Sequence, residues 1–83
     1  MNEKNATPRW FVNAVVPRPD YTLQLEFASG ESRVFDAKVL LDDPLFKPLR
    51  NLSLFMQAHR QGRSVVWNDE IDIAPEYLYE QSR

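Results

Sequence analysis

The sequence predicts a small α+β domain in which an antiparallel three-strand meander and a later short hairpin pack with two or three short helices. One observation is the strict alternation of apolar and polar residues over residues 21–27, which is typical of a half-buried strand. Another is the set of helix-start signals in the second half of the chain. A chain of 83 residues has room for one core. We therefore expect residues 10–83 to form a single domain and residues 1–9 to be a flexible N-terminal segment.

The first strand is expected over residues 10–16, a run rich in β-branched and aromatic side chains. Because apolar residues fall on both of its faces, this strand is predicted to be covered on both sides. The next segment, residues 17–20, contains Pro17 and Pro19 and is expected to be a connection.

The second and third strands are expected to form a hairpin. After the alternating strand at residues 21–27, Ser29-Gly30 predicts a two-residue turn, which places Glu26 opposite Arg33. In that register Phe35 lies on the outer face of the sheet. Either this face is partly covered, or the register differs by one residue.

Two helices are expected in the middle of the chain. Asp43-Pro44 is typical of a helix start, and Pro48 limits that helix to one or two turns. Asn51 is a second N-cap candidate, and Gly62 is placed to end the helix that it opens. The apolar face of this second helix would carry Leu52, Phe55, Met56 and His59.

The last third of the chain predicts a short hairpin and a helix. A strand is expected over residues 64–67, then a turn at residues 68–70, then a segment that pairs back over residues 71–73. Pro75 at a first helical position predicts a last helix over Pro75–Gln81. The residues expected to share one core are Leu23, Leu25, Phe27, Phe55 and Trp67.

Composition and charge exclude several function classes. Acidic residues number 12 and basic residues 10, and the net charge of −2 disfavours general nucleic-acid binding. Cysteine is absent and His59 is the only histidine, so we expect no metal site, no cofactor and no catalytic residue. No apolar run approaches the ~20 residues of a membrane span, and we expect a cytoplasmic protein with no membrane contact.

Residues along most of the chain carry a resemblance to a known family. They are Tyr21-x-Leu23-x-Leu25-x-Phe27, Gly30 and Val34-Phe35-Asp36, then Leu40-Leu41, Phe46, Leu49 and Phe55, and finally Val65-Val66-Trp67 and Asp72-Ile73-x-Pro75-Glu76-Tyr77-Leu78-Tyr79. Together they resemble the prokaryotic family called domain of unknown function 2442, over residues 10–80. The resemblance implies a small α+β domain with an antiparallel sheet. It assigns no catalytic or binding residue, and it suggests one partner of a toxin–antitoxin-like pair.

The leading functional hypothesis is a non-catalytic protein-interaction module, not an enzyme. The chain has many aromatic residues for its length, and Tyr77 and Tyr79 cannot both face inward from one helix. The outward tyrosine, together with Trp10, is the candidate partner-binding patch. The partner is an unidentified protein or a second copy of the chain, and a homodimer is expected.

Two alternative hypotheses use charged residues. An enzyme or small-ligand protein would use the acidic group Asp69, Asp72 and Glu76 near the last helix. A nucleic-acid-binding protein would use the basic residues Arg50, Arg60 and Arg63.

Overall fold

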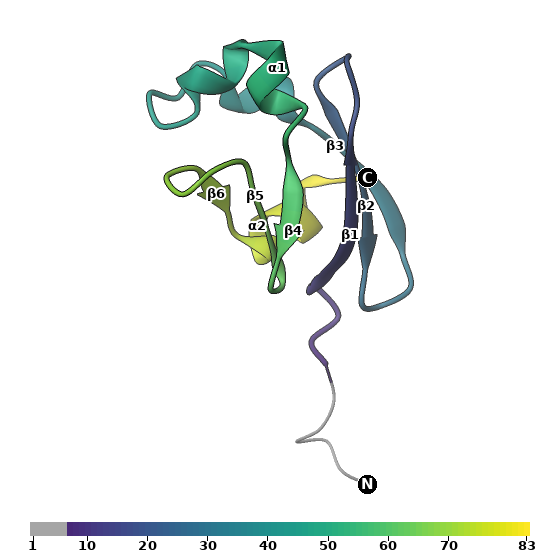
Figure 1. The fold of residues 1–83 in the computed structure, drawn as a ribbon. Coiled ribbons are helices and arrows are strands. Elements are labelled where there is room, and N and C mark those ends of the chain that lie inside the picture. The colour runs from purple at the N-terminus through teal and green to yellow at the C-terminus, as the bar shows by residue number, and fades with distance from the viewer. Residues whose placement is uncertain (1–6) are drawn as a thin grey trace, which may run out of the picture.

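The computed structural model describes residues 7–83 and contains two antiparallel three-stranded sheets, which confirms the predicted α+β class (Figure 1). Sheet A has the strand order β1-β2-β3, and sheet B has the order β4-β5-β6. The strands of sheet A are β1 (Val12–Pro17), β2 (Thr22–Phe27) and β3 (Ser32–Asp36). Those of sheet B are β4 (His59–Gln61), β5 (Ser64–Val66) and β6 (Asp72–Ile73). The later hairpin predicted from the sequence is therefore part of a second sheet.

Strand β1 differs from the prediction in its position and its cover. It begins at Val12, so Trp10 lies in the preceding turn, and a bulge between Val12 and Ala14 shifts its register against β2. The side chain of Val16 is 53% exposed, so the strand is not covered on both sides. Pro17 has no backbone N–H, and it ends the strand at a position where the pairing with β2 requires none. The N–H that donates to the carbonyl of Thr22 belongs to the next residue, Arg18.

Strand β2 has the predicted alternation, with Leu23, Leu25 and Phe27 buried, but the predicted register with β3 is wrong by one residue. Leu25 lies opposite Arg33, and Leu23 lies opposite Phe35. Phe35 therefore points into the core and is buried. Of the two alternatives that the sequence left open, the shifted register is the one found.

Both hairpins of sheet A close with the same three-residue loop. In the second hairpin, Gly30 donates to the carbonyl of Phe27 and has φ +93. In the first, Tyr21 donates to the carbonyl of Arg18 and has φ +66. A residue with positive φ at this place is the usual requirement of three-residue hairpin loops, which normally take glycine. The extra loop residue, compared with a two-residue turn, explains the shift in register.

A polar side chain supports each of these loops from the residue before the one with positive φ. Ser29 Oγ accepts the N–H of Glu31 at 3.1 Å. Asp20 Oδ1 accepts the N–H of Thr22 at 3.2 Å and its hydroxyl at 2.6 Å. These bonds lower the pKa of Asp20 below its ordinary value of 3.8, and the bond from the Thr22 hydroxyl has the largest effect.

The middle of the chain contains short helical turns, which we call the helical segment (residues 37–57). Its helices are η2 (Ala37–Leu40), η3 (Lys47–Arg50) and α1 (Leu52–Phe55). The helix predicted to start at Asp43-Pro44 is absent from the described chain. The Asp43 side chain accepts the N–H of Leu45 as a cap would, but only a turn follows before η3 begins at Lys47. Asn51 caps α1 as predicted, by accepting the N–H of Ser53.

The helix predicted to run from Asn51 to Gly62 ends early. Residue His59 lies in β4 and is exposed, so it is not on an apolar helix face. Gly62 has φ +63 and begins the two-residue loop between β4 and β5, so it turns a hairpin and does not end a helix.

The C-terminal elements agree with the prediction. Strand β5 pairs with β4 and β6, and Asn68 accepts the backbone N–H groups of Glu70 and Ile71 in the intervening turn. The last helix, α2, spans Pro75–Gln81 as expected.

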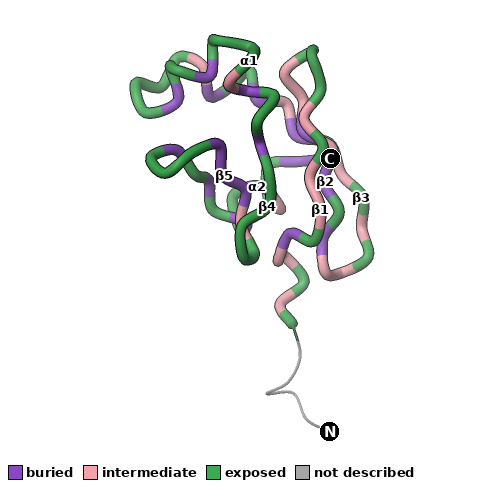
Figure 2. Tube along the Cα trace, in the orientation of Figure 1, coloured by how far each residue is buried: buried purple, intermediate pink, exposed green. Residues whose placement is uncertain are grey.

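The core lies between sheet A, sheet B, α1 and α2. Buried side chains line β2 and β5, whereas β4 is exposed throughout (Figure 2). The indole N–H of Trp67 donates to the carbonyl of Phe55 at 3.1 Å, which satisfies the one polar atom of that side chain. The five residues predicted to share one core do so: Leu23, Leu25, Phe27, Phe55 and Trp67.

The predicted flexible segment, residues 1–9, lies for the most part outside the described residues. Of its described part, the carbonyl of Pro8 accepts from Phe11 and that of Arg9 accepts from Ser29. The backbone next to Trp10 is therefore held against the second hairpin of sheet A.

Candidate functional site

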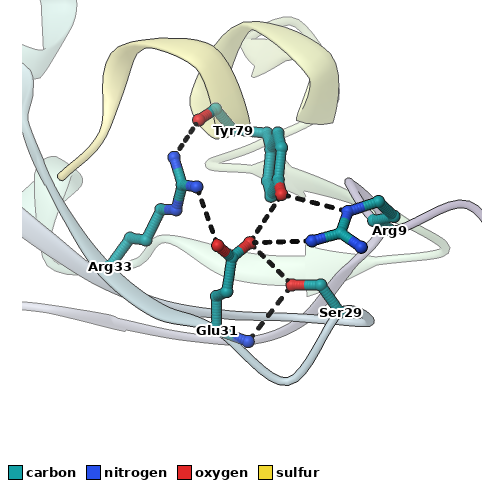
Figure 3. Close-up of polar contacts among 5 residues, drawn as sticks. All are labelled: Arg9, Ser29, Glu31, Arg33 and Tyr79. Carbon is teal, nitrogen blue, oxygen red and sulfur yellow. Dashed lines mark hydrogen bonds and ion pairs between the residues drawn. The ribbon is translucent and has the colours of Figure 1, made fainter.

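A cluster of polar side chains joins four separate parts of the fold. It consists of Arg9, Ser29, Glu31, Arg33 and Tyr79, which we call the Glu31 cluster (Figure 3). These residues come from the N-terminal turn, the β2–β3 loop, strand β3 and helix α2. The three-residue loop positions Ser29 and Glu31, and the register of β3 turns Arg33 toward α2.

Glu31 is the centre of the cluster. Its Oε1 accepts the hydroxyl of Tyr79 at 2.6 Å and that of Ser29 at 2.8 Å. Its Oε2 accepts from Arg33 Nη2 at 3.0 Å, and Arg9 Nη2 lies 4.0 Å from Oε1. Both carboxylate oxygens are therefore already engaged within the protein.

These contacts keep Glu31 ionised. The hydrogen bond from Tyr79, followed by those from Arg33 and Ser29, lowers the pKa of Glu31 from 4.5 to about 2. A general acid or base works best with a pKa near the working pH. The geometry and the pKa of Glu31 therefore suit a structural anchor.

Tyr79 is the second member that makes several contacts. Its hydroxyl donates to Glu31 and accepts from Arg9 Nε at 3.3 Å. The hydrogen bond with Arg9 is the largest cause of the raised pKa of Arg9. The Arg33 guanidinium lies 4.3 Å above the Tyr79 ring and donates to the Tyr79 carbonyl at 2.7 Å. The ring also packs edge-on against Phe27. The cluster thus fastens α2 to sheet A.

The residues predicted to bind a partner differ in their exposure and contacts. Tyr79 belongs to the Glu31 cluster and is half-buried, whereas Tyr77 is exposed and its ring contacts Phe35. Trp10 packs edge-on against Phe11, at a ring distance of 4.9 Å. Tyr77 is therefore the outward tyrosine of the two.

The predicted acidic group is exposed and dispersed. Asp69 lies in the loop before β6, Asp72 lies in β6, and Glu76 lies in the first turn of α2. Among residues 7–83 none of these three makes an ion pair, and no set of three His, Cys, Asp or Glu side chains converges as metal ligands would.

The predicted basic residues each have a separate local partner. Arg50 donates to the carbonyl of Leu41 and pairs with Asp42 at 3.1 Å. Arg60 donates to the carbonyl of Gly62, and the Arg63 guanidinium lies 5.1 Å from the centre of the Phe11 ring. They show no shared contact that would make them one binding surface.

The helical segment exposes several large apolar side chains. Val39 is 65% exposed and Leu45 is 56% exposed. With them, the apolar residues exposed on this segment are Val39, Leu45, Leu52 and Met56. Such side chains gain most from burial against a partner.

Sequence reasoning missed the Glu31 cluster and the exposed apolar residues of the helical segment. The cluster joins residues separated by up to 70 positions, so no local spacing pattern reveals it. The one available signal was Glu31 two residues before Arg33, a spacing that puts opposite charges on one face of a strand. Of the exposed apolar residues, the sequence places Leu52 and Met56 on the apolar face of a predicted helix, and it assigns no role to Val39 and Leu45.

No pocket opens among residues 7–83. Within the same residues there is no helix whose length and hydropathy would let it cross a membrane.

Comparison with known proteins places the chain in a family. The family model DUF2442, described as "Protein of unknown function", matches residues 12–83, from the first residue of β1 to Arg83. No curated protein and no solved structure matches the chain. With nearly its whole described length covered by that match, the chain belongs to the DUF2442 family.

Proposed function

We propose that this domain is a non-catalytic protein-interaction module. The observation that carries the proposal is the exposure of Val39, Leu45, Leu52 and Met56 on the helical segment. Full burial of a fully exposed Val or Leu side chain is worth about 1.5–3 kcal/mol. These side chains are 38–65% exposed, so each contributes part of that amount to the affinity for a partner that covers it.

The helical segment is well placed to present these side chains. In Figure 1 it is drawn in teal and green and lies above β5 and β6. Its backbone is held from below, because the Tyr21 hydroxyl donates to the carbonyl of Arg50 at 2.6 Å and the buried Leu49 and Phe55 join the core. A preformed surface of this kind loses little conformational entropy on binding.

We further propose that the partner is a small protein with which this domain forms a pair, as in a toxin–antitoxin arrangement, inside the cytoplasm. The pairing is what the resemblance seen in the sequence implies, while the matched family model itself assigns no function. The exposed tyrosine of α2, Tyr77, supplies an additional aromatic contact for such a partner.

Affinity capture from the native cell tests the proposal with three baits. They are the unchanged protein, the double variant Val39→Ser/Leu45→Ser, and the control variant Val16→Ser. Val16 is also an exposed valine, but it lies on the outer face of sheet A. All three substitutions are at exposed positions, so each bait should melt within a few degrees of the others.

The expected result is a protein that is captured by the unchanged bait and by the Val16 variant but lost with the double variant. Equal recovery by all three baits would exclude the helical segment as the binding surface. If no protein is enriched over an unrelated control domain, the interaction proposal itself fails.

A further inference from the structure

Strand β3 forms one edge of sheet A, and its hydrogen-bonding groups alternate between the two sides. Phe27 donates to the carbonyl of Glu31 at one end of the hairpin, and Ala37 donates to that of Tyr21 at the other. With the register of β2 and β3, these bonds direct the backbone groups of Arg33 and Phe35 toward β2. The backbone groups of Ser32, Val34 and Asp36 therefore face outward.

The outward groups of Val34 are occupied by the end of the described chain. Val34 N–H donates to the carbonyl of Arg83 at 2.8 Å, and Arg83 N–H donates to the carbonyl of Val34 at 3.0 Å. Such reciprocal bonds between two residues define an antiparallel pair. Ser82 is extended, with φ −90 and ψ 168, so the chain turns after α2 and Arg83 pairs with Val34 alone at the edge of β3.

The position of residues 82–83 against β3 carries an energetic penalty. Ser82 is 8% exposed, and its Oγ has no hydrogen-bond partner among the described residues. A buried hydroxyl without a partner has lost its hydration and gained nothing in exchange. Moving residues 82–83 away from β3 returns this hydroxyl to water.

We propose that the edge of β3 is a strand-addition interface for a second copy of this chain, and that residues 82–83 close it reversibly. The inference goes beyond the proposed interaction function, because it concerns a different surface and a second copy of this chain. In the open form, the β3 strands of two copies pair antiparallel about a two-fold axis at Val34, and the two sheets A become one continuous sheet.

The side chains of β3 are compatible with such self-pairing. On the outer face the axis places Val34 opposite the partner's Val34, and Ser32 opposite the partner's Asp36. The valine side chain is 38% exposed in the single copy, and it continues the row formed by Val16 and Gln24 across sheet A. The serine hydroxyl can donate to the carboxylate, and no like charges lie opposite each other on this face.

Sedimentation velocity over a hundredfold dilution range tests the proposal with the full chain and two edge variants. Val34→Lys places two lysines directly opposite each other at the axis and should weaken the dimer at least tenfold. The matched control is Val16→Lys, which adds the same charge in the same row but on β1, far from the axis. It should leave the dimer unchanged.

Two further variants shift the balance between the closed and the open form in opposite directions. Arg83→Pro removes the N–H that donates to the carbonyl of Val34, so one hydrogen bond fewer is broken when residues 82–83 leave β3. The dimer should therefore become roughly tenfold tighter. Ser82→Ala removes the unpartnered hydroxyl, stabilises the closed form and should weaken the dimer. A variant that acts only on folding would not move association in these opposed directions.

The results that overturn the proposal are distinct from those that overturn the interaction function. A monomer at every concentration for both the unchanged chain and Arg83→Pro removes self-association through β3. A dimer that Val34→Lys and Val16→Lys weaken equally places the interface elsewhere. Neither result affects capture of a different protein by the helical segment, which the Val39/Leu45 baits report separately.

Discussion

Tyr21 combines an unfavourable backbone conformation with favourable side-chain contacts. Its φ of +66 lies in the left-handed region, which costs an L-residue roughly 1–2 kcal/mol. In return its ring packs against Phe55 at 4.8 Å and its hydroxyl donates to the carbonyl of Arg50. A glycine would suit the backbone better, but it would release the helical segment from sheet A.

Replacing Tyr21 by phenylalanine should isolate the contribution of this hydroxyl. The variant keeps the ring packing and loses one hydrogen bond, so the free energy of unfolding should fall by about 1 kcal/mol. Urea denaturation measures the change. Tyr77→Phe is the matched control, because the Tyr77 hydroxyl makes no hydrogen bond to the described residues and its loss should cost almost nothing. Equal effects of the two substitutions would contradict this assignment.

Glu31 predicts a specific dependence of stability on pH. Its pKa is about 2 in the folded protein and 4.5 as its ordinary value, so the folded state binds the proton less tightly than the unfolded state. The stabilisation that it provides is complete above about pH 4.5 and is lost as the pH falls toward about 2. Below that range Glu31 no longer favours the folded state.

Comparing Glu31→Gln with the unchanged protein tests this dependence. The difference in melting temperature should be constant near neutral pH, shrink below about pH 4.5, and approach its minimum near pH 2. Glu26→Gln serves as the control, because Glu26 is exposed on β2 and makes no ion pair among the described residues. A difference for Glu31→Gln that does not vary with pH would show that the cluster acts through shape alone.

At the scale of single elements, the sequence predicted periodic strands and proline-started helices well. The alternation in β2 and the proline at the start of α2 are local signals, and both elements lie where expected. The predicted hairpin register was wrong because glycine is typical of both two-residue and three-residue loops. A loop longer by one residue moves Phe35 from the outer face of the sheet to the core face.

The error at residues 56–62 has a different physical cause. Phe55 and His59 have helical spacing, and Gly62 has the composition of a helix end, but the helix stops at Phe55. Residues 59–61 gain more by pairing with β5, whose Val65 and Val66 are buried, than by extending a helix with an exposed face. Tertiary pairing thus decides the element, and no local pattern contains that information.

The loop that sets the register should be sensitive to the residue at position 30. Gly30 has φ +93, and a Cβ there would meet no atom within 4 Å, so a substitution is opposed only by the backbone. Gly30→Ala should lower the free energy of unfolding by about 1–2 kcal/mol. Gly30→Asn should cost less, because asparagine adopts positive φ more readily. Denaturant titration of both variants checks the order, and equal costs would contradict a backbone origin.

At the scale of the whole molecule, one core holds both sheets, and the five residues that the sequence predicts for it lie there. Apolar alternation identified the inner face of β2, and size alone made Trp67 a core candidate. The Glu31 cluster could not be predicted, because it depends on where α2 packs, which is itself a result of the core. The exposure of the apolar residues of the helical segment could not be predicted either, because it depends on how the short helices pack.

Leu25 tests the unity of this core. It is fully buried in the central strand of sheet A, so Leu25→Ala should cost about 2–5 kcal/mol of the free energy of unfolding. Val16→Ala, at an exposed position of the adjacent strand, should cost far less. Both values come from urea denaturation, and a melt of the Leu25 variant within a degree or two of the unchanged protein would contradict the assigned strand faces.

The placement of the two tryptophans gives the protein a built-in optical reporter. Trp67 is 2% exposed, with its indole N–H bonded to Phe55, whereas Trp10 is half-exposed in the turn before β1. In a Trp10→Phe variant the remaining fluorescence should be emitted at short wavelength and resist quenching by acrylamide. Because the Trp67 ring contacts Phe55 and Phe46, its emission should change when the helical segment no longer packs against sheet B. Loosening of that junction can be followed in solution without any attached dye.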